Sequence, residues 1–220
     1  MTGHSNTDTK PGLPDAPGPW RTAERKRLIT ERMDIPNETR VEYATAIAGT
    51  LKDLIGSAAG LTVSAYWPIR GEPDLRELTQ WIDEQGGRFA LPVVVARAQP
   101  LVFRAWRTGD PLERGVWNIP VPSAGAEVIP DVVISPLVGF DAGCYRLGYG
   151  GGFYDRTLAS LERKPKVFGV GYEMARLATI HPQPHDIPMD VIVTQDGAAI
   201  IRGDANIRAK SEVDESRSRA

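Results

Sequence analysis

The residues between Gly139 and Arg156 carry the strongest chemical signal in this chain. Five glycines fall within positions 143–152, and Tyr154, Asp155 and Arg156 follow them. Glycine lets a backbone adopt positive φ and approach a ligand closely, and the N–H groups of such a loop point at anions. Arg146 and Arg156 stand at its two ends, where planar cations suit phosphate oxygens, and Asp155 offers a hard oxygen to Mg2+. The segment therefore predicts a phosphate-binding loop.

The elements around this loop support the same prediction. Residues 131–138 are apolar and β-branched, which is typical of a buried strand, and a helical pattern begins at Phe153. A Walker A loop is excluded because Phe153 follows Gly152 in place of Gly-Lys-Ser/Thr, and a dinucleotide fingerprint would need glycine at 153. A glycine-rich hairpin without a ligand is the alternative, and the charges at 146, 155 and 156 weigh against it.

The run from Arg146 to Arg156, with Phe140-Asp141 before it, resembles the signature of the 5-formyltetrahydrofolate cyclo-ligase family, whose members are also called methenyltetrahydrofolate synthetases. Three further segments resemble landmarks of that family in the same order, and they are Tyr66–Asp74, Trp117–Pro120 and His185–Thr194. Together the four segments cover roughly residues 20–201, most of the chain.

The resemblance implies a three-layer α/β/α sandwich with a mainly parallel sheet, like that of the ribose-phosphate isomerase and CoA-transferase group. The alternation of strands and helices from Leu61 onward favours the same class. We expect one domain over residues 20–203, a disordered N-terminal tail over 1–19 and a flexible charged tail over 204–220.

The element pattern can be predicted in more detail. Helices are expected over 20–33, from 37, over 153–161 and 174–178, and one capped by Asp74 that stops at Gly86-Gly87. Strands are expected over 61–67, 89–95, 100–106 and 166–172, and a hairpin joins 191–194 to 198–201. The Pro- and Gly-rich stretch 108–130 is longer than a linker in a compact domain should be, which indicates a functional segment.

The resemblance implies that ATP phosphates bind the glycine-rich loop and the first helix. Arg21 and Arg25 lie four apart on one helical face, and Arg21 stands where the family usually has lysine. The ATP-binding residues implied are Arg21, Arg25, Arg146, Leu147, Gly148, Tyr149, Gly150, Gly151, Gly152, Phe153 and Tyr154.

The folate side of the site is implied in the same way. Glu72 matches the substrate-contacting glutamate of the family, and together with Arg146 it is assigned to catalysis. The substrate-binding residues implied are Trp67, Glu72, Trp117, Tyr149 and Phe153. Asp155 and Asp190 are expected to hold Mg2+, because Asp190 begins a strand that would lie beside Asp155.

The activity implied is the ATP- and Mg2+-dependent cyclisation of 5-formyltetrahydrofolate to 5,10-methenyltetrahydrofolate, with release of ADP and phosphate. Two alternatives stay open. A paralogue that has lost this activity would bind nucleotide or folate as a regulatory module, and a phosphosugar isomerase on the same fold would act without ATP.

Composition sets the remaining expectations. The chain has 220 residues, a formal net charge of -2 and one cysteine, Cys144, which predicts no pull toward nucleic acid or anionic membranes and no intramolecular disulfide. No apolar run is long enough to span a bilayer, and residues 1–19 lack the apolar core of a signal peptide. We expect a cytoplasmic protein, a monomer or weak homo-oligomer, whose partners are the two small molecules.

Overall fold

The structure is a computed structural model that describes residues 17–203. Its helices are α1 (Pro17–Asp34), α2 (Asn37–Ile55), α3 (Glu77–Glu84) and α4 (Phe153–Ser160), with 3-10 turns at Val116–Asn118 and Glu173–Ala175. Its strands are β1 (Thr62–Ser64), β2 (Arg88–Val93), β3 (Val102–Ala105), β4 (Leu112–Arg114), β5 (Pro120–Pro122), β6 (Glu127–Val128), β7 (Val132–Pro136), β8 (Gly139–Phe140), β9 (Arg146–Leu147), β10 (Lys166–Val170), β11 (Val191–Thr194) and β12 (Gly197–Ile201).

Eight of these strands form one central sheet in the order β12-β11-β10-β7-β1-β2-β3-β6. The five inner strands β11, β10, β7, β1 and β2 are parallel, whereas β12 at one edge and β3 and β6 at the other pair antiparallel. The mainly parallel sheet predicted from the sequence is thus confirmed.

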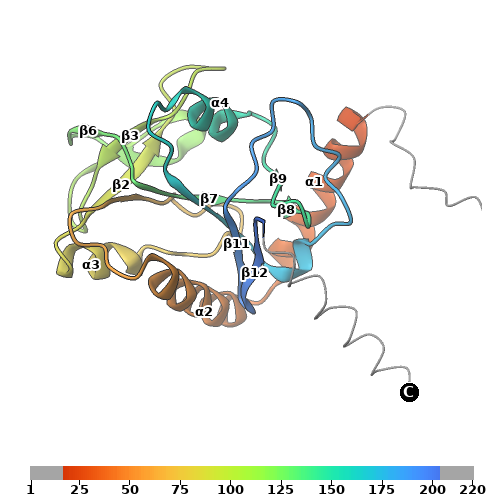
Figure 1. Cartoon of the computed structure of the whole chain (residues 1–220), viewed down its shortest axis with the longest axis horizontal. Coiled ribbons are helices and arrows are strands. Elements are labelled where there is room, and N and C mark those ends of the chain that lie inside the picture. Colours follow the sequence, from red (N-terminus) through yellow and green to blue (C-terminus); the bar gives the residue numbers. More distant parts are fainter. Residues whose placement is uncertain (1–16, 204–220) are drawn as a thin grey trace, which may run out of the picture.

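The sheet is covered by helices on both faces (Figure 1), because its inner strands are apolar on both sides. In β7, Val132 and Ile134 belong to the core beneath α2 and α3, while Val133 belongs to the core that includes Leu28 of α1 and Leu158 of α4. This alternation follows from the two-residue period of a strand, and it produces the three layers.

Most of the predicted elements are present, with differences at their boundaries. α1 begins at Pro17, so residues 17–19, assigned to the N-terminal tail, are helical. α3 begins at Glu77, and Asp74 does not cap it; the Asp74 carboxylate instead accepts a hydrogen bond from the Arg76 N–H at 3.1 Å. Residues 108–130 hold the β4–β5 hairpin and β6. The rest of both predicted tails lies outside the described residues.

Parallel strands bring their carboxyl ends to one edge of the sheet, and loops leaving that edge form the ligand crevice of such folds. β1 leads there into the segment that holds Glu72, and β7 leads into the glycine-rich loop. The architecture therefore brings together the two segments to which the sequence analysis assigned substrate and nucleotide. Among the helices of residues 17–203, none combines the length and apolarity needed to cross a membrane.

Candidate active site

A cavity of about 600 Å3 opens at the carboxyl edge of the sheet. Its floor includes Leu91 of β2 and Pro136 of β7, and its walls come from α1, the 116–121 segment, the glycine-rich loop and residues 185–186. Every residue that the family resemblance assigned to ATP, folate or metal lines this cavity except Asp190, and Arg156, the second cation predicted for the phosphate loop, does not line it either. Segments far apart in the sequence thus converge on one site.

The glycine-rich loop forms one wall and ends in α4. Its start is fixed by the short β8–β9 hairpin, in which Asp141 accepts hydrogen bonds from the N–H groups of Gly143 at 2.9 Å and Ile180 at 3.0 Å. Gly150 and Gly152 have φ of 95° and 63°, values that disfavour side chains. Within residues 17–203, no N–H of positions 149–152 donates a hydrogen bond, so these groups and the start of α4 are free to receive an anion.

Arg146 and Asp155 form an ion pair inside this wall. Nη2 of Arg146 donates to Oδ1 of Asp155 at 2.8 Å, and Nη1 donates to the Ile187 carbonyl at 3.0 Å. The Arg146 side chain is only 4% exposed, and this burial lowers its pKa although the charge of Asp155 raises it. Both side chains line the cavity, and they pair with each other.

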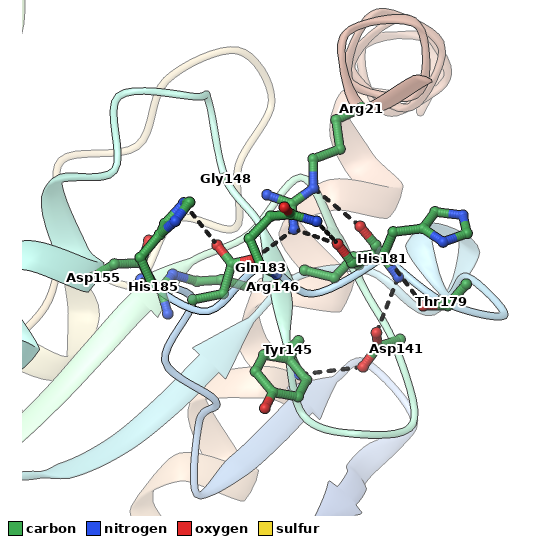
Figure 2. A network of polar contacts seen from close by, with 12 residues as sticks. Arg21, Asp141, Tyr145, Arg146, Gly148, Asp155, Thr179, His181, Gln183 and His185 are labelled. Carbon is green, nitrogen blue, oxygen red and sulfur yellow. Dashed lines mark hydrogen bonds and ion pairs between the residues drawn. The ribbon is translucent and has the colours of Figure 1, made fainter. Parts of the chain in front are cut away.

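Two arginines of α1 also line the cavity, and Figure 2 shows the contacts of the first, Arg21. Arg21 donates through Nε to the Ile180 carbonyl at 3.1 Å and through Nη2 to the His181 carbonyl at 2.9 Å and to the Asp186 carboxylate. Arg25 donates to the Gly148 carbonyl at 2.7 Å, and burial, followed by the charge of Arg21, lowers its pKa. Arg21 therefore ties α1 to the 180–186 segment, while Arg25 lies directly against the glycine-rich loop.

The structure corrects the pairing of Asp155 with Asp190. The Asp190 carboxylate accepts the Val167 N–H at 2.7 Å at the start of β11, the end of the sheet away from the cavity. Asp186 lines the cavity instead, where Oδ2 accepts the Gln183 N–H at 2.7 Å in addition to Arg21. The segment His185–Thr194 contains both Asp186 and Asp190. Which of the two carboxylates faces the cavity depends on how the chain turns between them, and the sequence does not show this.

On the folate side, Glu72 is buried and fully engaged. It is 6% exposed, Oε1 accepts the Tyr149 hydroxyl at 2.7 Å, and Oε2 accepts the Ile69 N–H at 2.9 Å. Burial raises the pKa of Glu72, while the Ile69 N–H, Arg32 and Tyr149 each lower it. Arg32 also donates to the Tyr149 hydroxyl, a contact that the sequence analysis missed.

Aromatic rings border the space between these groups. Trp117 is 64% exposed, adopts φ of 57° and meets Phe153 edge to face with ring centroids 5.6 Å apart. Trp67, which lines the cavity, packs edge to face against Trp106, which does not, with ring centroids 6.0 Å apart. The hydroxyl of Tyr154 is buried and has no hydrogen-bond partner among the described residues. Flat faces and an unpaired hydroxyl suit a flat, polar ring system.

Within residues 17–203, His181, His185 and Cys144 do not form a separate metal or nucleophile site. His181 packs against Trp20 with ring centroids 4.6 Å apart, and residues 17–203 contain no cluster of three or more His, Cys, Asp or Glu side chains able to hold a metal. Cys144 is fully buried, and burial raises the pKa of its thiol to about 11, so it is not a nucleophile.

Comparison with known proteins decides the family. The sequence profile of the 5-formyltetrahydrofolate cyclo-ligase family matches residues 17–195. The chain belongs to this family. It is 34% identical over 178 residues to the 5-formyltetrahydrofolate cyclo-ligase of Mycolicibacterium smegmatis, an alignment that covers 77% of this chain and 91% of that protein. The family predicted from four segments is thereby confirmed.

Solved structures agree with the fold. The NMR structure of Aquifex aeolicus 5,10-methenyltetrahydrofolate synthetase is 27% identical, with a TM-score of 0.74 over 85% of this chain and 95% of that one. The 5,10-methenyltetrahydrofolate synthetase of Mycoplasma pneumoniae, at 22% identity, has the same fold with a TM-score of 0.67, over 80% of this chain and 98% of that one.

Proposed function

We propose that this protein converts 5-formyltetrahydrofolate and ATP to 5,10-methenyltetrahydrofolate, ADP and phosphate. Membership of the cyclo-ligase family supports the reaction. The single observation that carries it to this chain is one cavity lined both by an anion-receptive glycine loop and by a buried carboxylate, Glu72, which contacts Tyr149 of that loop. The cytoplasmic location and the monomeric or weakly associated state remain predictions from the sequence.

The chemical problem is that a formyl oxygen is a poor leaving group. If that oxygen attacks the γ-phosphorus of ATP, an imidate phosphate forms and ADP leaves; N10 then closes the ring, and phosphate departs with the former formyl oxygen. No side-chain nucleophile is required. The protein's contribution is to align the two substrates and to balance the phosphate charge.

The residues divide by side of the cavity. We assign the N–H groups of Gly148 to Gly152 and the guanidinium of Arg25 to the phosphates, with Arg146 as the buried cation behind them. Arg21 contributes by holding the 180–186 segment in place. Glu72 orients the folate, with the rings of Trp67, Trp117, Tyr149 and Phe153 around it.

Asp155 and Asp186 fit the Mg2+ that the family implies. Oδ1 of Asp155 and Oδ2 of Asp186 accept the bonds described above, whereas among residues 17–203 the other oxygen of each accepts no hydrogen bond. Oδ1 of Asp186 lies 3.8 Å from Nε2 of the exposed His185. A hard oxygen without a hydrogen bond on each of two cavity carboxylates suits a cation that also binds phosphate and water. When bound, Mg2+ would neutralise phosphate charge.

The test is to follow methenyltetrahydrofolate by absorbance with 5-formyltetrahydrofolate and Mg2+, with ATP present or omitted. We expect the product only when ATP is present. Mg-ATP binding without product would instead indicate the binding or regulatory paralogue. Absence of both product and nucleotide binding would refute the assignment of the loop to phosphate.

A further inference from the structure

Arg32 is a buried cation that supports the site from outside. It lies in α1 eleven residues after Arg21, about three helical turns, so it occupies the same face as Arg21 and Arg25. Its exposed fraction is 4%, and unlike Arg21 and Arg25 it does not line the cavity. A buried guanidinium is costly unless its donors are satisfied, so its partners show what it does.

All three groups of donors on Arg32 reach segments that build the site. Nε donates to the Arg70 carbonyl at 2.9 Å, Nη1 donates to the Leu137 carbonyl at 3.2 Å, and Nη2 donates to the Tyr149 hydroxyl. These partners lie in the loop after β1, at the end of β7 and in the glycine-rich loop. One side chain thus connects the substrate segment to the nucleotide segment.

The Tyr149 hydroxyl extends this connection to Glu72. It accepts from Arg32 and donates to Oε1 of Glu72 at 2.7 Å, which makes a chain from cation through hydroxyl to carboxylate. The guanidinium groups of Arg32 and Arg70 also lie 5.8 Å and 5.5 Å from the centre of the Tyr149 ring. The ring is therefore held by cations, and its hydroxyl is held in a single direction.

We propose that Arg32 is a positioning residue that acts through Tyr149 to fix the orientation and negative charge of Glu72, so that the nucleotide loop and the folate subsite form one unit. The inference rests on the proposed function, because it says how that same site orders its folate. Loss of the relay should harm the folate side and spare the phosphate side, which is held by Arg25, Arg146 and backbone N–H groups.

The charges around Glu72 set the expected pH effect. The groups that face it are Arg32 from α1, Arg70 from its own loop, Tyr149 from the glycine-rich loop, Tyr66 after β1, Tyr154 from α4 and Tyr172 after β10. Arg32 lowers the pKa of Glu72 more than Arg70 does. Without Arg32 the carboxylate is protonated at a higher pH, so the acid limb of kcat/KM should move upward.

The experiment compares Arg32→Met and Tyr149→Phe with Arg27→Met, a control on the exposed face of the same helix where Arg27 pairs with Glu24 and Glu31. We expect kcat/KM for 5-formyltetrahydrofolate to fall about 10- to 100-fold in the first two variants, the range of one hydrogen bond to a charged group. We expect KM for ATP to stay within about twofold and the control to match wild type.

Tyr149→Phe tests the relay even if Arg32→Met fails to fold. It removes the hydroxyl that links Arg32 to Glu72 but leaves the hydrogen bonds from Arg32 to the Leu137 and Arg70 carbonyls. The proposal would be overturned if kcat/KM fell equally for ATP and for 5-formyltetrahydrofolate. It would also be overturned if Tyr149→Phe changed neither the acid limb of the pH profile of kcat/KM nor the kinetics with folate. Binding of 5-formyltetrahydrofolate, followed by tryptophan fluorescence, separates the two claims. An inactive wild type refutes the proposed function, whereas equal folate affinity in wild type and Tyr149→Phe refutes the relay.

Discussion

At the scale of single residues, the site is a set of charges that neutralise one another before any ligand binds. Arg146 holds Asp155, Arg21 holds Asp186, and Arg32 reaches Glu72 through Tyr149. Such pairing lets charged groups stay buried at the carboxyl edge, and among residues 17–203 it leaves one oxygen of Asp155 and one of Asp186 without a hydrogen bond. The same groups therefore serve stability and chemistry.

The pair of Arg146 and Asp155 gives the first prediction. Asp155→Ala leaves a buried guanidinium without its counter-charge, so it should lower the free energy of unfolding by about 3–5 kcal/mol as well as weaken Mg-ATP binding. The double variant Arg146→Met/Asp155→Leu removes both charges, and in urea unfolding it should recover most of the lost stability without recovering turnover. If Asp155→Ala is as stable as wild type, the pair does not have the energetic role assigned here.

Placement in the cavity was predictable where local sequence or the family resemblance decides it. The glycines of positions 148–152 and Arg146 follow from the motif, because the backbone conformation and flanking charges of a loop are local, and Glu72 follows from the resemblance; all of them line the cavity, while their roles stay predictions. The exchange of Asp190 for Asp186 was not predictable, because two carboxylates four residues apart differ only in how the chain turns between them. Arg32 was missed although its spacing from Arg21 and Arg25 placed it on the buried face.

At the scale of elements, α1 and two loops assemble the site around the sheet. α1 contacts the 180–186 segment through Arg21, the glycine-rich loop through Arg25 and the segment after β1 through Arg32. Helices and strands were largely predictable from periodicity, but these docking contacts depend on arginine side chains that a sequence pattern classes as a solvated face.

The contact between α1 and the 180–186 segment depends on pH. Burial alone raises the pKa of Asp186, but the hydrogen bonds from Arg21 and Gln183 and the charge of Arg21 bring it below its ordinary value of 3.8. The ionised Asp186 carboxylate therefore contributes its full stabilisation above pH 3.8, the ordinary pKa that it has in the unfolded chain. This stabilisation is lost as the pH falls through the lower pKa of Asp186 in the folded chain.

Asp186→Asn should therefore lower the free energy of unfolding at pH 7 by about 1.5–3 kcal/mol, the range for hydrogen bonds to charged groups. The difference from wild type should shrink as the pH is lowered toward 3 in a series of urea unfolding curves. Asp74→Asn, in the exposed pair with Arg76, is the control with a small effect. A difference that is constant from pH 7 to pH 3 would contradict the assigned ion pair.

The 116–121 segment supplies the aromatic cover of the cavity. Trp117 is largely exposed at positive φ and contacts Phe153 at the start of α4, so its ring is accessible to a ligand. Trp117→Ala should leave the melting temperature within about 2 °C and weaken 5-formyltetrahydrofolate binding about tenfold, since aromatic contacts contribute about 0.5–1.5 kcal/mol beyond area burial. A destabilised variant with normal folate affinity would make Trp117 a structural residue.

In the whole molecule, a three-layer fold brings the segment that holds Glu72 and the glycine-rich loop to one cavity at the carboxyl edge of the sheet. The class of the fold was predictable because alternating strands and helices permit few architectures. β3 was predicted as the strand over 100–106, but β6 and the β4–β5 hairpin were not predictable, since the Pro- and Gly-rich sequence of 108–130 does not specify which strands pair.

Ligand binding should therefore stabilise the entire domain. A ligand that binds only the folded chain adds about 2.7 kcal/mol at one hundred times its Kd, so Mg-ATP should raise the melting temperature by several degrees. Chelation of Mg2+ by EDTA should remove most of that shift. A shift that is the same with and without EDTA would mean that Asp155 and Asp186 do not act through a metal.

The proposed reaction requires that the cavity bring the formyl oxygen to the γ-phosphorus of ATP. This can be tested by following an 18O label from the formyl group of 5-formyltetrahydrofolate during turnover with unlabelled ATP and water. We expect the label in the released phosphate, one atom for each methenyltetrahydrofolate formed. Unlabelled phosphate accompanying ring closure would contradict phosphoryl transfer to the substrate, and with it the division of the cavity into a phosphate side and a folate side.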